Sequence, residues 1–165
     1  TGKRVVLILS GPEPQRRILR QKVTDIFKDS DMQLVILEGK PGDNHDAVVS
    51  GNICSYSHLP APEFRKVLLE SDYIISRSGY STIMELASLN RSALLIPTPG
   101  QTEQEYLAEH LSEMGWFAIV SQRHLGKGLI LPRNKDLHAE SIIDESSRLL
   151  EDALVDLLDQ QEKDA

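Results

Sequence analysis

The segment 75–86, which reads I-S-R-S-G-Y-S-T-I-M-E-L, combines residue types that could bind an anion. An apolar run ends there in a short polar loop with one glycine, and a helical pattern begins at once. Ser78, Gly79, Ser81 and Thr82 would gather backbone N–H groups and hydroxyls at the start of that helix. Such an end carries partial positive charge and unpaired donors, so it suits a phosphate group.

Glu85 lies about one turn inside the same predicted helix. Its carboxylate could accept hydrogen bonds from the hydroxyls of a ribose. A second interpretation needs no ligand, because Thr82 and Glu85 have the spacing of a capping box, in which the two side chains bind amides of their own helix end. The sequence leaves both interpretations open.

Two other loops with polar residues follow predicted strands. The loop around Gly11 lacks the three glycines of a dinucleotide fingerprint and the Gly-Lys-Ser/Thr of a P-loop. Arg16 lies in the first turns of the next predicted helix, where it opposes the helix dipole and could reach a diphosphate at Gly11. Gln104 and Glu105, in the third loop, could bind sugar hydroxyls, although Glu105 also forms a capping box with Thr102.

The overall composition limits the classes of partner. The chain has 165 residues, which suits one domain with a buried core. Its net charge of −7 argues against nucleic acid as a partner. The single cysteine, Cys54, excludes an internal disulfide, and the histidines lack the spacing of metal ligands. No apolar stretch is long enough to span a bilayer.

Apolar runs typical of buried strands alternate with amphipathic helical patterns along the chain. The predicted strands cover residues 4–9, 33–37, 51–55, 73–76, 93–96 and 117–120, and the predicted helices cover 15–28, 63–70, 82–89, 103–114 and 136–158. This alternation predicts an α/β fold, a Rossmann-like three-layer domain with a parallel sheet of about six strands. The three polar loops should therefore meet at the carboxyl edge of the sheet, with strands 4–9 and 73–76 as neighbours at the switch in strand order.

Two stretches resemble a known family. They read R-S-G-Y-S-T-I-M-E-L at residues 77–86 and A-L-L-I-P-T-P-G-Q-T-E-Q-E-Y-L-A-E-H-L at residues 93–111. Both are similar to the C-terminal domain of GT-B glycosyltransferases, above all the family of the peptidoglycan N-acetylglucosaminyltransferase acting on lipid-linked precursors and the plant galactolipid synthases. The resemblance covers residues 5–120 and implies a domain that binds a nucleotide-sugar donor, usually a UDP-sugar.

The resemblance also implies roles for individual residues. Glu85 would bind the ribose, Gln104 the donor sugar, and the segment near Leu59 the base by backbone contacts. Glu105 stands where the peptidoglycan enzyme has a second glutamine, which puts N-acetylglucosamine as the sugar in doubt. The residues expected to hold the diphosphate are Gly11, Arg16, Ser78, Gly79, Tyr80, Ser81 and Thr82.

From these points we expect the donor-binding domain of a hexosyltransferase that moves a sugar from a UDP-sugar to an acceptor hydroxyl, without a metal or another cofactor. The catalytic base would lie in an N-terminal acceptor-binding domain or subunit, so residues 1–165 would be a single domain of a larger protein, inactive alone. We expect a cytoplasmic location, with membrane contact only for the full-length protein. The alternatives are a nucleotide-sugar hydrolase or epimerase, and a non-catalytic nucleotide-binding subunit.

Overall fold

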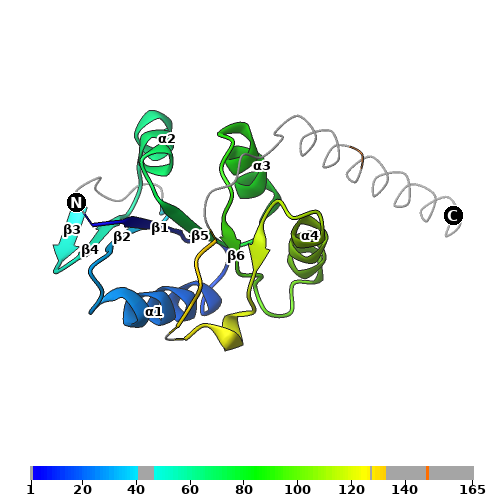
Figure 1. Ribbon diagram of the computed structural model, residues 1–165, viewed down its shortest axis with the longest axis horizontal. Coiled ribbons are helices and arrows are strands. Elements are labelled where there is room, and N and C mark those ends of the chain that lie inside the picture. The colour runs from blue at the N-terminus through cyan, green and yellow to red at the C-terminus, as the bar shows by residue number, and fades with distance from the viewer. Residues whose placement is uncertain (1, 41–46, 127, 133–147, 149–165) are drawn as a thin grey trace, which may run out of the picture.

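The computed structural model describes residues 2–40, 47–126, 128–132 and 148. They form a seven-stranded sheet in the order β3-β4-β2-β1-β5-β6-β7 (Figure 1). The strands are β1 (Arg4–Ile8), β2 (Gln33–Leu37), β3 (Ala47–Ser50), β4 (Ile53–Tyr56), β5 (Tyr73–Ser76), β6 (Leu94–Leu95) and β7 (Ala118–Ile119). The helices are α1 (Gln15–Phe27), α2 (Ala61–Leu69), α3 (Tyr80–Ser88) and α4 (Thr102–Glu113), with a short 3₁₀ turn η1 (Gln122–His124).

Helices cover both faces of the sheet, which explains why its central strands are apolar throughout. Figure 1 shows α2 and α3 above the sheet and α1 below it. On one face, α2, α3 and α4 contribute residues such as Leu68, Ile83 and Leu111 to a buried cluster. On the other face, α1 contributes Leu19 and Val23 to a second cluster. The predicted three-layer α/β fold is therefore confirmed.

The strand order puts the expected neighbours together. β1 pairs in parallel with β2 on one side and with β5 on the other. The order reverses at this point, since the chain first adds strands beyond β2 and later adds them beyond β5. The loops after β1, β5 and β6 therefore lie along the carboxyl edge of the sheet, where parallel sheets bind ligands.

One strand of the otherwise parallel sheet is antiparallel. β3 pairs antiparallel with β4 through a two-residue turn, Gly51 and Asn52. Gly51 has φ +60°, a left-handed conformation that glycine adopts at low cost in hairpin turns. The predicted strand at 51–55 starts too early for this reason. The helix predicted at 136–158 falls outside the described residues except for Arg148.

Candidate functional site

The N-terminus of α3 lies at the carboxyl edge of the sheet, directly after β5. Gly79 is the N-cap residue, with φ −73° and ψ 137°, and no described side chain caps this end. The first amide bonded within the helix is that of Ile83, which donates to the Gly79 carbonyl at 3.1 Å. The amides of Tyr80, Ser81 and Thr82 come before it and have no intrahelical acceptor.

The capping-box interpretation of this segment is wrong. The helix begins at Tyr80 rather than at Thr82, so Thr82 lies in the first turn and cannot act as the N-cap. Glu85 is half-buried, and its carboxylate makes no hydrogen bond or ion pair within the part of the chain that the structure describes. An open helix end and an uncommitted carboxylate thus lie one turn apart.

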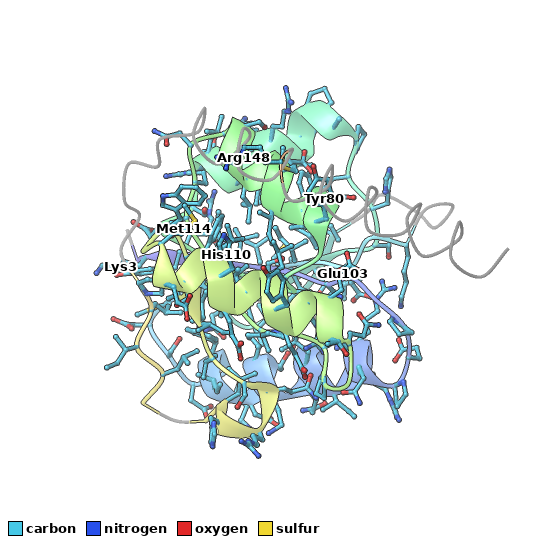
Figure 2. The ribbon with its side chains drawn as sticks, turned by 90° about the vertical axis from the view of Figure 1, so that its right-hand side faces the viewer. Lys3, Tyr80, Glu103, His110, Met114 and Arg148 are labelled. Atoms are coloured by element: carbon cyan, nitrogen blue, oxygen red, sulfur yellow. The ribbon has the colours of Figure 1, made fainter. Side chains whose placement is uncertain are left out.

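The N-termini of α3 and α4 lie at the same end of the molecule. Figure 2 shows Tyr80 and Glu103, in the first turns of α3 and α4, at the same end of the molecule, with Met114 at the opposite end of α4. Ser78 joins the two helix starts, because its buried hydroxyl donates to the Gln104 carbonyl at 2.7 Å. The Ser78 hydroxyl proton is therefore used within the protein.

Gln104 and Glu105 fold the third loop onto α4. The Gln104 side-chain oxygen accepts from the Thr98 amide at 3.0 Å, and its nitrogen donates to Gln101 at 2.6 Å. Glu105 accepts from the Gly100 amide at 3.3 Å. The capping box predicted for Thr102 and Glu105 is wrong, because Gln101 is the N-cap and no side chain caps this helix. Binding of a sugar by these two residues stays a prediction.

Gly11 brings the first loop against the third. It has φ +89°, and a Cβ added there would come within 3.8 Å of the Thr98 hydroxyl. Thr98 is 2% exposed, and its hydroxyl oxygen has no hydrogen-bond partner within the described residues. A buried hydroxyl without a partner is costly unless a ligand or water satisfies it. Thr98 was not singled out from the sequence as a site residue.

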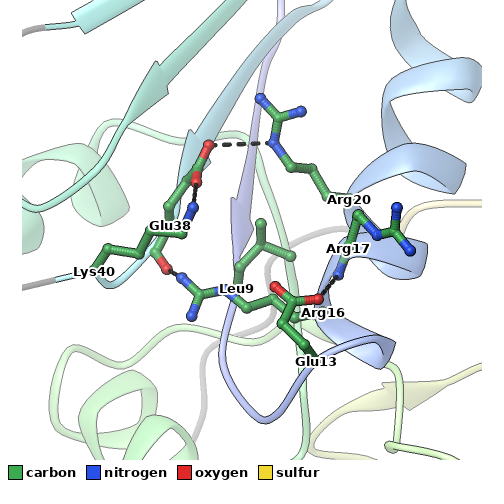
Figure 3. Close-up of a pocket in the computed structure, with 7 residues that line it drawn as sticks. All are labelled: Leu9, Glu13, Arg16, Arg17, Arg20, Glu38 and Lys40. Carbon is green, nitrogen blue, oxygen red and sulfur yellow. Dashed lines mark hydrogen bonds and ion pairs between the residues drawn. The ribbon is translucent and has the colours of Figure 1, made fainter.

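Arg16 lies in a cavity of about 280 Å³ between the first loop and the end of β2. Its guanidinium donates to the backbone oxygen of Glu38 (Figure 3). The Glu38 carboxylate accepts from Arg20 at 3.2 Å and pairs with Lys40 at 3.0 Å. Burial acts to raise the pKa of Glu38, but Lys40 and Arg20 together outweigh it and lower that pKa below its usual value. These cations are therefore largely committed to Glu38, and contact between Arg16 and a diphosphate stays a prediction.

Leu59 lines a second cavity, of about 190 Å³, at the carboxyl ends of β1, β2 and β4. Tyr56, His58 and Phe64 also line it, together with Leu37 at the end of β2. Aromatic and apolar walls of this kind suit a flat nucleobase. Glu38 lines the cavity as well. Leu59 thus lies in a cavity on the side of the sheet that carries α3, and binding of a base there stays a prediction.

Arg77 is a second residue at this edge of the sheet that was not singled out from the sequence. It follows β5 directly, is 0% exposed, and is the largest fully buried side chain among the described residues. Its guanidinium donates to carbonyl oxygens at the start of α1 and the end of β6, and to the side chain of Gln122. Burial lowers the pKa of Arg77 to about 10. The signal available in the sequence was a charged residue directly after a buried strand.

Neither a metal site nor a membrane-spanning helix is present among the described residues. None of their His, Cys, Asp and Glu side chains form a group of three or more able to hold a metal ion. None of their helices combines the length and apolar character required to cross a membrane.

Solved structures similar to this chain are glycosyltransferases with the GT-B fold, and the chain shares the fold of one of their domains. MurG of Acinetobacter baumannii matches with a TM-score of 0.56 and 20% identity, over 76% of this chain and 40% of that one. The kitacinnamycin glycosyltransferase matches with a TM-score of 0.58 and 17% identity, over 76% and 32%. The solution structure of ALG13 matches with a TM-score of 0.53 and 11% identity, over 75% and 81%.

The chain belongs to the glycosyltransferase family 28 C-terminal domain family, whose model matches residues 5–153. Two curated relatives are UDP-N-acetylglucosamine–N-acetylmuramyl-(pentapeptide) pyrophosphoryl-undecaprenol N-acetylglucosamine transferases. That of Desulforudis audaxviator is 39% identical over 54% of this chain, and that of a Sulfurihydrogenibium species is 20% identical over 93%. The matched regions span 24% and 44% of these relatives, respectively.

Proposed function

We propose that this chain is the donor-binding domain of a glycosyltransferase that moves a hexose from a UDP-sugar to an acceptor hydroxyl. The observation that carries the proposal is the uncapped N-terminus of α3, with the Glu85 carboxylate one turn behind it. Free amides suit a diphosphate and a free carboxylate suits ribose hydroxyls. The cavity at Leu59, on the same side of the sheet, would receive the base.

In the transfer step, the acceptor oxygen attacks the anomeric carbon of the sugar, and the bond from that carbon to the β-phosphate oxygen breaks. UDP leaves with the electron pair of that bond. The amides of Tyr80, Ser81 and Thr82 would stabilise the negative charge that develops on the diphosphate, because no acceptor within the helix uses them. A base outside this domain would take the acceptor proton.

The proposal includes the donor, the metal requirement of the transfer, the location of the protein and its acceptor-binding partner. The curated relatives carry UDP-N-acetylglucosamine in their names, which supports a UDP-sugar as donor. The helix end would carry the charge that a metal ion carries in other transferases, so transfer should proceed in the presence of a chelator. We also propose a cytoplasmic protein in which an N-terminal domain or partner subunit binds the acceptor.

Titration calorimetry of UDP against the chain tests the site. Wild type should bind UDP, and Glu85→Ala should weaken binding by about ten- to a hundredfold, since a hydrogen bond to a charged group contributes about 1.5–3 kcal/mol. Glu109→Ala, which removes an exposed carboxylate further along α4, serves as the matched control and should bind like wild type. Absence of UDP binding to the wild-type chain would overturn the proposal.

Transfer and hydrolysis are distinguished in the protein with its acceptor-binding part present. A transferase releases free sugar from the donor much more slowly without an acceptor than it forms product with one. Rapid release of free sugar without an acceptor would favour a hydrolase on the same donor site.

A further inference from the structure

The guanidinium of Arg77 is buried at the carboxyl edge of the sheet, and no described acidic side chain pairs with it. It donates to the carbonyls of Gln15 at 2.8 Å and of Ile96 and Pro97 at 3.1 Å. It also donates to the side-chain oxygen of Gln122 at 2.6 Å. All four acceptors are neutral, and Nε has no partner within the described residues. The positive charge is therefore shared with dipoles but not neutralised.

These bonds tie together segments that are far apart in sequence. Gln15 begins α1, Ile96 and Pro97 follow β6, and Gln122 begins η1. Gln122 also donates to the Gln15 side chain at 2.8 Å, which closes a ring of contacts around the guanidinium. Arg77 therefore fixes the segment before Gly79 from the side of α1.

Ser78 fixes the same segment from the opposite side of the sheet. Its hydroxyl donates to the Gln104 carbonyl in α4, which packs on the other face from α1. Two consecutive side chains thus anchor the residues that precede the open amides of α3. The amides can be held in a fixed orientation without any capping side chain.

A buried arginine without an acidic partner is expensive, and an apolar side chain of similar size often serves the fold as well or better. Burial lowers the pKa of Arg77 to about 10, so the group stays charged at neutral pH. The four hydrogen bonds of Arg77 hold these segments together, but its uncompensated charge adds a cost to the fold. A charge that the protein leaves uncompensated can act on an anion at the edge above it.

We propose that Arg77 is a positioning residue that holds the first turn of α3 in place and supplies positive charge beneath the diphosphate. The inference rests on the proposed function, because it needs a diphosphate at the end of α3. Arg77 does not touch the ligand, since its side chain is fully buried. Its effect should therefore fall on the diphosphate and spare the nucleoside.

The central experiment measures UDP and uridine binding to the full chain side by side, with Gln122→Glu as the main variant. This change keeps an acceptor oxygen next to the guanidinium and adds a carboxylate that neutralises it. It removes the hydrogen bond that Gln122 donates to Gln15, but the Gln15 amide can turn so that its nitrogen donates to the new carboxylate. We expect UDP affinity to fall about tenfold while uridine affinity stays within about twofold of wild type. Equal affinity changes for UDP and uridine would overturn the inference.

Arg77→Met removes the charge and the four hydrogen bonds together, and should lower UDP affinity further at unchanged uridine affinity. Arg91→Met is the matched control. Arg91 also donates to backbone carbonyls, but those of Leu68 and Ser71 lie at the C-terminal end of α2, away from this edge. Arg91→Met should alter neither affinity. If Arg77→Met fails to fold, the UDP and uridine affinities of Gln122→Glu still test the proposal.

The two proposals fail in different ways. A wild-type chain that binds no UDP contradicts the proposed function itself. A wild-type chain that binds UDP, with Gln122→Glu binding UDP equally well, leaves the donor site standing and assigns Arg77 a purely structural role.

Discussion

Gly79 keeps the helix end of the candidate site open. Its backbone is extended, with φ −73°, so side-chain residues could adopt the same conformation. A Cβ added at Gly79 would meet no atom within 4 Å. Neither strain nor crowding therefore explains a glycine there. What glycine avoids is a polar side chain at the N-cap, which would bind the amides that a diphosphate needs.

Replacing Gly79 with aspartate should separate stability from binding. Gly79→Asp adds a capping carboxylate, and we expect the free energy of unfolding in urea to rise by about 0.5 kcal/mol. UDP binding should be lost, because the carboxylate occupies the amides and repels the diphosphate. Gly79→Asn caps without charge and should weaken UDP binding less. Wild-type affinity in Gly79→Asp would show that the diphosphate does not lie at this helix end.

Glu38 should make the chain sensitive to acid. Its folded-state pKa lies below the usual 4.5, so the stability that it contributes is complete above that value and is lost as the pH falls through the folded pKa. Thermal unfolding from neutral pH down to about pH 3 should show a loss in wild type that is smaller in Glu38→Gln. If the unfolding temperatures of wild type and Glu38→Gln fall equally as the pH is lowered, Arg20 and Lys40 do not stabilise the ionised Glu38 carboxylate.

Of the two edge strands of the sheet, β3 has the more exposed apolar side chains. Val48 and Val49 are 69% and 68% exposed. Both β3 side-chain faces are thus open to solvent, and β3 lies at the end of the strand order. An edge strand with exposed valines can pair with another chain unless it is covered.

Placing a charge on β3 should lower self-association without harming the fold. In Val48→Lys the free energy of unfolding should change by less than about 0.5 kcal/mol, because the side chain is exposed. Light scattering at high protein concentration should show less association than wild type, with Val48→Thr as the uncharged control. Equal association of Val48→Lys and wild type would argue that this edge does not pair.

The sequence predicted those elements whose burial is continuous along the chain. The apolar run in β1 and the loop-to-helix transition after β5 follow from local residue types, so both strands and the presence of α3 could be predicted. The sequence left open whether the start of α3 is capped, and it placed that start at residue 82 instead of Tyr80. β3 could not, since four residues beside a turn give little periodic signal. The partners of Arg77 could not be predicted either, because Gln15 and Gln122 lie 62 and 45 positions away from it.

At the scale of the whole molecule, the sheet separates two apolar clusters that should respond independently. Ile36 in β2 belongs to the cluster on the α1 face, and Ile83 in α3 to the cluster on the other face. Ile36→Val and Ile83→Val should each lower the free energy of unfolding by about 0.5–1.5 kcal/mol. The double variant should show the sum within about 0.5 kcal/mol in urea unfolding. A larger deviation would mean that the two layers are coupled through the sheet.

The central place of β1 has a consequence for how the protein is made. Among the strands of this sheet, β1 leaves the ribosome first, yet it is enclosed on its second side only when β5, which ends at Ser76, has emerged. The bond from Gln122 to Gln15 spans 107 positions and forms later still. Contacts of such long range slow folding and leave early segments exposed. The nascent chain should therefore stay dependent on chaperones until most of the domain has been synthesised.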